Sequence, residues 1–451
     1  MKKQILSALT ILLVASGGMA QAPTDTLRLS LDDCLRIALN ENPTVKVAEM
    51  EIERVDYSKK ETIGKLFPDI SFSGQYSRTL AKQTMYMDTG EGTMAIKVGR
   101  DNTHSVGFNA TVPIIMPTLW KSLKLSDNQI LQNVEAARAS RLSLVNQVKN
   151  AYFAYLLAVD SKAVLEENHS TAKFNADIYA KKYELGTASE YDVLRSSVAV
   201  TNIEPSILEA ENVITQCLLQ LKVLMGMDVN INFLPNDALE NYRNSMFNTQ
   251  VAADTALVNN TNLRTLDLQT DYLKKALDVQ KMSWFPTLTG SINYMWLSMS
   301  NGSPFKNFTW SPTSTAGLTL SIPISSGGQR YFKQKQAEVS LREMKWQREN
   351  LERSLQMQVQ VQQDNINKSL KQIATNEGGV RQAKKANDIM QESFRIGAAS
   401  FIQLLDTEDA LLSARLAYYQ AIYNYLVGQS DLEYVLGNAP LDKYVTTSTE
   451  Y

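Results

Sequence analysis

The sequence has few of the residues that enzymes and metal sites use. It contains only two histidines and two cysteines in 451 residues. Cys34 and Cys217 are too few for a disulfide scaffold and fit no metal motif, and the sequence leaves open whether they are free or bonded. His104 falls in a predicted external loop and His169 on a predicted long helix, where solvation is expected. No phosphate-binding glycine loop, His-Glu-x-x-His motif or nucleophile elbow occurs. We therefore expect no enzyme, no cofactor and no metal site.

Long apolar runs and an excess of one charge are also missing. Charged residues make up 20% of the chain and nearly cancel, with a formal net charge of −2. A nucleic-acid partner would need a clustered basic face, so none is expected. After residue 20 no apolar run approaches the roughly 20 residues of a membrane-spanning helix. Before it, Lys2 and Lys3 precede a short apolar run and then small residues. This pattern predicts a cleaved signal peptide over residues 1–20.

What the sequence does contain is one internal duplication. The matching segments are Ala38-Leu39 with Asn42 and Ala256-Leu257 with Asn260, Leu66-Phe67-Pro68 and Trp284-Phe285-Pro286, Val112-Pro113-Ile114 and Ile322-Pro323-Ile324, Tyr183 to Gly186 and Phe394 to Gly397, and Met225-Gly226 and Leu436-Gly437. A repeat of about half the chain indicates a duplicated unit and not a short-period solenoid. We expect one unit over 21–245, a second over 246–440, and a disordered tail over 441–451.

Both units have the same predicted order of elements: an amphipathic helix, two strands joined by a polar loop, and two long helices joined by a glycine turn. In the first unit these are a helix at 31–64, strands at about 69–80 and 104–115, and helices at about 120–185 and 188–225. In the second unit they are a helix at 251–283, strands at about 287–299 and 313–324, and helices at about 328–396 and 400–436.

The strands are predicted from alternation with period two. Val106, Phe108 and Ala110, for example, alternate with small and polar residues, as in a half-buried strand. On alternation alone, an ordinary soluble sheet is the better interpretation. The signal peptide and the long helices favour membrane strands instead, whose polar face lines water. Four strands cannot close a barrel around water, and open edges are unsatisfied in lipid. Three copies would supply twelve strands.

The helices are predicted to be unusually long. Between Pro117 and Pro205 there is no proline, and Gly186 is the only glycine. A helix from about 120 to 184 would be roughly 95 Å long at 1.5 Å per residue. Gly186 and Gly397 can adopt the positive φ that a helix reversal requires. Pro205 lies in the returning helix, which we expect it to kink or interrupt.

The order of these signals resembles the TolC-like outer-membrane efflux proteins. The residues that carry the resemblance are the Phe-Pro before each first strand and the two turns, Tyr183 to Leu194 and Phe394 to Asp406. It covers about residues 25–440. It implies a mainly α fold with a β-barrel portion: a homotrimer with a 12-stranded barrel in the outer membrane of a Gram-negative bacterium, above a periplasmic α-barrel.

The resemblance also implies a function. Members of this family passively conduct substrates that a periplasmic adaptor and an inner-membrane pump deliver, in tripartite efflux or type I secretion. The alternative is a non-channel, extended coiled-coil structural protein of the envelope, but such a protein would have no use for four matched strands.

The resemblance places a gate at the glycine turns, where the family often carries acidic rings. Asp192 and Asp406 match acidic positions of that pattern. Gln403 stands where an aspartate is common, Phe394 replaces a tyrosine, and Ala399 replaces a locking arginine of some members. The adaptor is expected at Gly186, Thr187, Gly397 and Ala398. From the residues alone, both aspartates are also explained as helix-start carboxylates near a positive helix end.

Overall fold

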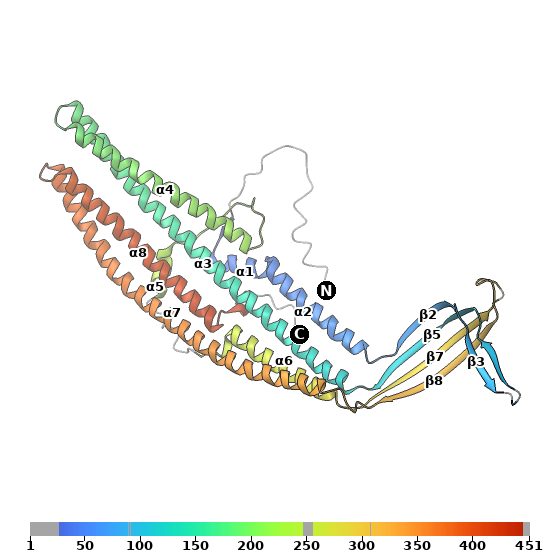
Figure 1. Ribbon diagram of the computed structural model, residues 1–451. Coiled ribbons are helices and arrows are strands. Elements are labelled where there is room, and N and C mark those ends of the chain that lie inside the picture. Colours follow the sequence, from blue (N-terminus) through green and yellow to red (C-terminus); the bar gives the residue numbers. More distant parts are fainter. Residues whose placement is uncertain (1–26, 89, 91, 247–255, 307, 445–451) are drawn as a thin grey trace, which may run out of the picture.

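A computed structural model describes residues 27–88, 90, 92–246, 256–306 and 308–444. The predicted signal peptide therefore lies outside the described residues. Two antiparallel helical hairpins dominate the molecule and run side by side, with their turns at one end and a β-sheet at the other (Figure 1). The hairpins consist of α3 (Pro117–Glu184) with α4 (Glu190–Leu224), and of α7 (Gln329–Arg395) with α8 (Phe401–Leu436).

The long helices follow from the absence of helix-breaking residues. α3 has 68 residues and is thus about 100 Å long at 1.5 Å per residue. It begins with Pro117 in its first turn, where a proline loses no hydrogen bond. α4 continues through Pro205, so the predicted interruption there is wrong. Pro205 and Thr201 are both exposed, so water can satisfy the Thr201 carbonyl that the proline leaves without a donor. Within the described ranges, no helix is both long and apolar enough to cross a bilayer.

Four antiparallel strands form the sheet, in the order β2-β5-β7-β8. Their bounds are β2 (Asp69–Arg78), β5 (Asn102–Ile115), β7 (Thr287–Ser300) and β8 (Trp310–Ser321). The two repeats meet where β5 pairs with β7. β8 begins and ends three residues earlier than the predicted strand, so Ile322 and Ile324 lie outside it. Pro323 lies two residues after the end of β8 and has no N–H to donate to a ladder.

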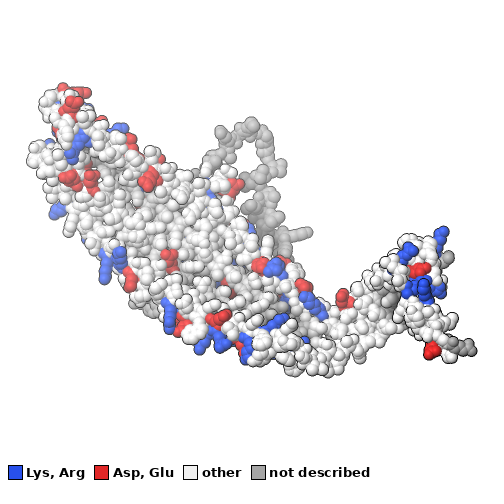
Figure 2. Space-filling view, viewed as in Figure 1, with Lys and Arg blue, Asp and Glu red and all other residues white. Residues whose placement is uncertain are grey.

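One face of this sheet is apolar across all four strands. The ladder places Phe72, Phe108 and Tyr294 side by side, and Ile70, Ala110 and Ile292 form the next row on the same face. Phe72 and Ile70 remain 62% and 68% exposed in the single chain. The opposite face carries mainly serine, threonine and asparagine. In Figure 2 most of the sheet carries no charged side chains, which gather at its far end.

The loop predicted between the first two strands contains a second, smaller sheet. β3 (Gln83–Asp88) and β4 (Thr93–Val98) pair as an antiparallel hairpin at the end of the main sheet that is far from the helices (Figure 1). The prediction of a polar loop without strands is therefore wrong for this segment.

The single helix predicted at 31–64 is two helices, α1 (Leu31–Glu41) and α2 (Pro43–Gly64). The break falls at Asn42 because a residue before proline disfavours helical backbone, and Asn42 has ψ 126°. The second repeat has the same break at Asn260, between the 3₁₀ turn Leu257–Asn259 and α6 (Thr261–Met282). Residues 251–255 of the predicted helix lie outside the described residues.

Each break is anchored by the end of a long helix. Asn42 accepts a hydrogen bond from the Thr44 N–H and donates one to the Leu224 carbonyl (2.8 Å). Asn260 likewise accepts from the Leu263 N–H and donates to the Val435 carbonyl (2.6 Å). One asparagine thus begins one helix and satisfies a free carbonyl at the end of another, once in each repeat.

The main core lies midway along the helices, where α1 and the two hairpins meet. Tyr152, Leu221 and Tyr425 are among its buried members, and both cysteines are buried in it as free thiols. Burial raises the pKa of Cys34 to about 12. Two short strands, β1 (Leu27–Leu29) and β6 (Phe233–Pro235), and helix α5 (Leu239–Met246) belong to the same region.

The described part of the predicted disordered tail has defined structure. Leu441–Lys443 form a 3₁₀ turn. Lys443 pairs with Asp32 at 2.7 Å, and the Tyr444 hydroxyl donates to Asp32 at 2.8 Å. Residues 445–451 lie outside the described residues.

Candidate functional site at the tips of the helical hairpins

The turns at Gly186 and Gly397 have the same geometry. Both glycines have positive φ, 70° and 80°. The Thr187 N–H donates to the Lys182 carbonyl, and the Ala398 N–H donates to the Ser393 carbonyl, each at 2.8 Å. This is the six-to-one bond of a Schellman motif, in which glycine accepts left-handed backbone without strain. All four residues predicted to contact an adaptor, Gly186, Thr187, Gly397 and Ala398, are exposed.

Asp192 takes part in a capping box at the start of α4. Ser189 donates to Asp192 Oδ2 through its N–H (3.2 Å) and its hydroxyl (2.7 Å), and Ser189 Oγ accepts from the Asp192 N–H. Gln403 makes the same set of bonds with Ser400 at the start of α8. The structural counterpart of Asp192 is therefore Gln403, and both side chains have a local role in starting a helix.

Asp406 lies about one turn further along α8 and differs from both. Its side chain is exposed and has no hydrogen-bond or ion-pair partner among the described residues. Together with burial, its charge raises the pKa of the nearby Asp409. The helix-start explanation thus fits Asp192, whereas Asp406 makes none of these capping bonds.

Aromatic side chains join the two hairpins just behind the turns. Tyr179 of α3 is buried against Phe401 of α8, with ring centroids 4.5 Å apart. Phe394 of α7 completes the group at 6.1 and 6.2 Å from these two rings. The Lys182 ammonium lies over the rings of Tyr179 and Phe394, at 5.4 and 5.1 Å, which is within cation–π range. Burial, with a smaller effect from the Asp192 carboxylate, raises the pKa of Tyr179 to about 12.

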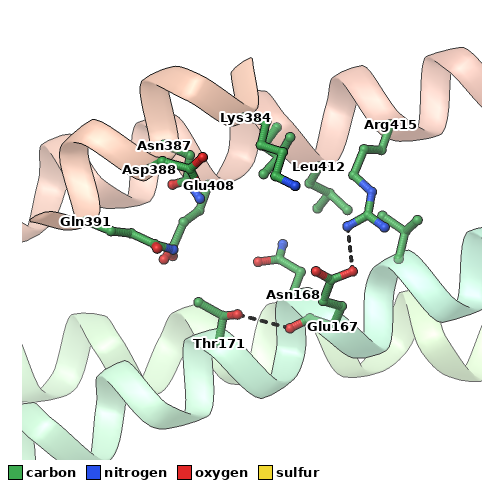
Figure 3. Close-up of a pocket in the computed structure, with 12 residues that line it drawn as sticks. Glu167, Asn168, Thr171, Lys384, Asn387, Asp388, Gln391, Glu408, Leu412 and Arg415 are labelled. Atoms are coloured by element: carbon green, nitrogen blue, oxygen red, sulfur yellow. Dashed lines mark hydrogen bonds and ion pairs between the residues drawn. The ribbon is translucent and has the colours of Figure 1, made fainter. Parts of the chain in front are cut away.

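Farther from the tip, a buried polar pair spans the same interface. Asn175 Nδ2 of α3 donates to both carboxylate oxygens of Glu408 in α8, at 3.2 and 3.4 Å. Both residues are buried, and this burial raises the pKa of Glu408. Figure 3 shows the adjoining cavity of about 220 Å³, across which Glu167 pairs with Arg415 at 2.5 Å.

The structure therefore brings only some of the predicted residues together. Phe394 joins the aromatic contact, while Asp192 and Gln403 sit at equivalent positions of separate hairpins. Sequence reasoning missed Tyr179, Asn175 and Glu408, because no short motif marks a contact between residues 233 positions apart. Among the described residues, no group of three or more His, Cys, Asp or Glu side chains could hold a metal ion.

The chain is thus an elongated protein in which two long helical hairpins extend from a short four-stranded sheet. The sequence matches the family described as "Outer membrane efflux protein" over residues 34–227 and 252–438. The chain therefore belongs to this family. Its members are outer-membrane channels and not enzymes, and the chain is an outer-membrane protein of Gram-negative type.

Individual relatives agree with this placement. The chain is 24% identical over 376 residues to the outer membrane protein TolC of Escherichia coli (strain K12). This alignment covers 77% of this chain and 74% of that protein. It is 22% identical over 416 residues to the alkaline protease secretion protein AprF of Pseudomonas aeruginosa, covering 92% and 85%.

Solved structures share the fold. The CmeC outer membrane channel of Campylobacter jejuni superposes with a TM-score of 0.75 at 18% identity, covering 93% of this chain and 87% of that chain. The open state of the MtrE outer membrane channel of Neisseria gonorrhoeae gives a TM-score of 0.71 at 16% identity, covering 94% and 95%. The predicted fold of paired membrane strands and long helices is confirmed.

Proposed function

We propose that three copies of this chain form a duct that passively conducts substrates from a periplasmic adaptor and an inner-membrane pump to the exterior. The assembly would be a tripartite efflux or type I secretion system. The name of AprF concerns protease secretion, and the matched family is described by efflux. Both kinds of system use the same passive element, an outer-membrane channel.

The observation that carries this proposal is the pair of free sheet edges. In the described chain β2 pairs only with β5, and β8 only with β7. In lipid, each unsatisfied backbone group costs several kcal/mol. Pairing β8 of one copy with β2 of the next removes both edges. Threefold symmetry then closes a twelve-stranded barrel, with the face of Phe72 and Phe108 toward lipid.

The hairpin tips would form the periplasmic entrance. Three copies of Asp406 would present free carboxylates there, which attract cations in a narrow pore. The exposed turn residues Thr187 and Ala398 are the proposed contacts of the adaptor. Because Ala399 has no polar side chain, closure would depend on the aromatic contact of Tyr179 with Phe394 and Phe401.

Cysteine cross-linking across the free edges tests the trimer. Ser73 of β2 is replaced by cysteine together with Ser311, Thr313 or Thr315 of β8, one at a time, in outer-membrane fractions. We expect at least one pair to form an oxidation-dependent ladder that ends at the trimer. Ser73→Cys alone is the control. It should form no ladder, because the native Cys34 and Cys217 are buried. A soluble periplasmic monomer without a ladder would instead support the coiled-coil alternative.

A photo-cross-linker placed at Thr187 or Ala398 tests the adaptor contact separately. It should capture the adaptor that is co-expressed from the same export system, whereas a cross-linker at the exposed Lys345 of α7 should not. Equal capture at all three positions would refute the assignment of the turns.

A further inference from the structure

The β3–β4 hairpin carries three methionines on one face. The ladder pairs Met87 with Met94, and Met85 with Ile96. Alternate residues of a strand point to the same side, and paired residues share a side. Met85, Met87 and Met94 therefore lie together on one face, beside Ile96 and Val98. They are 51%, 55% and 57% exposed, so the face is open to solvent.

The spacing allows the three sulfur atoms to meet. Directly paired residues have Cβ atoms about 4.5–5.5 Å apart, and diagonal neighbours are about 7–8 Å apart. Met87 and Met94 are the direct pair, and Met85 is the diagonal neighbour of Met94. Methionine is unbranched and has three rotatable side-chain bonds, so all three thioethers can turn toward one point above the sheet.

The chemistry of this face selects soft metal ions. Asp88, Thr93 and Lys97 belong to pairs that point to the opposite side of the hairpin. Among the paired residues of β3 and β4, the only polar side chain on the methionine face is the Gln83 amide, at its far end. Magnesium and calcium require oxygen ligands, and zinc is bound mainly by thiolate, imidazole and carboxylate. Thioether sulfur suits Cu(I) and ions of the same class.

We propose that Met85, Met87 and Met94 form a surface site for a monovalent soft metal ion of the Cu(I) class. The bound ion would link β3 to β4. A lone two-stranded hairpin is marginally stable in water, so this link would order the outer end of the chain. The site does not depend on the trimer or on the export role, because all three ligands come from one hairpin.

Silver binding tests the proposal without redox chemistry. The full-length protein in detergent is titrated with Ag(I) in a chloride-free buffer, and binding is followed by calorimetry. Met85→Leu/Met87→Leu/Met94→Leu removes the sulfur atoms but keeps apolar side chains of similar size. Its affinity for Ag(I) should fall by more than about tenfold, because losing only the groups that support metal ligands already costs roughly 10–100-fold.

The matched control is Met50→Leu/Met299→Leu/Met357→Leu, which replaces three exposed methionines on separate elements. This variant should bind Ag(I) like the unaltered protein. The buried thiols of Cys34 and Cys217 are present in every variant, so their contribution cancels in the comparison. NMR of 13C-methyl methionine gives a second readout, in which the Met85, Met87 and Met94 methyls should shift first on Ag(I) addition. Unchanged affinity in the hairpin variant, or shifts spread over all methionines, would overturn the site.

Discussion

Tyr179 of α3 and Phe401 of α8 place their rings 4.5 Å apart at the tips of the two hairpins. Both side chains are nearly fully buried, although the surrounding tips are exposed. Each ring belongs to a different sequence repeat, so their contact fixes the two hairpins to each other beside the turns. Aromatic pairs of this kind contribute about 0.5–1.5 kcal/mol beyond the area that they bury.

Phe401→Ala should therefore loosen the tips. If the tips are the entrance of a duct, the variant should show higher single-channel conductance in planar bilayers and more frequent opening. Phe174→Ala is the matched control, since Phe174 lies on the same helix as Tyr179 but is 65% exposed. Equal conductance of Phe401→Ala and the unaltered protein would show that this contact does not restrict the entrance.

The two acidic gate candidates should respond differently to neutralisation. Asp406→Asn removes an exposed carboxylate that has no partner among the described residues, so cation selectivity and block by divalent cations should decrease in planar bilayers. Asp192→Asn keeps an acceptor oxygen for Ser189, as Gln403 does for Ser400. It should change stability by less than about 1 kcal/mol and leave selectivity nearly unchanged. A larger effect of Asp192→Asn on selectivity would reverse the assignment.

The sequence was sufficient to predict features that depend on periodicity, including the duplication, the four main strands and the paired long helices. It did not predict features that depend on contacts between distant segments. The carboxylate of Glu408 meets Asn175 only because α3 and α8 lie side by side. The break at Asn42 could have been found, since Pro43 disfavours helix at the residue before it. Asn260 precedes Thr261, so its break could have been inferred only from its match to Asn42 in the duplication. The sequence left the role of Asp192 open, because an aspartate at the start of a helix beside a glycine turn fits both a capping carboxylate and a pore carboxylate.

Gly437→Ala should destabilise the protein strongly. Gly437 ends α8 with φ 71°, and a Cβ there would clash with the Asn259 carbonyl. Gly226→Ala should behave similarly in the first repeat, where the Cβ would lie 2.7 Å from the Glu41 carbonyl. Gly379→Ala is the control, because Gly379 lies inside α7 and a Cβ there would meet no atom within 4 Å. That variant should gain roughly 0.5–1 kcal/mol. Thermal unfolding in detergent measures all three, and equal midpoints would contradict the close-approach explanation.

The contact between the hairpins that Glu408 makes with Asn175 should weaken as pH rises. Burial, the largest cause, raises its pKa above the ordinary value of 4.5. The folded state therefore holds a proton that the unfolded chain has released, and stability falls with rising pH between the ordinary pKa and the raised one.

Glu408→Gln keeps an acceptor for Asn175 but cannot ionise. Relative to the unaltered protein, it should become progressively more stable as pH increases through this window, as measured by unfolding midpoints at a series of pH values. A constant difference between Glu408→Gln and the unaltered protein at every pH would show that folding does not raise the pKa of Glu408.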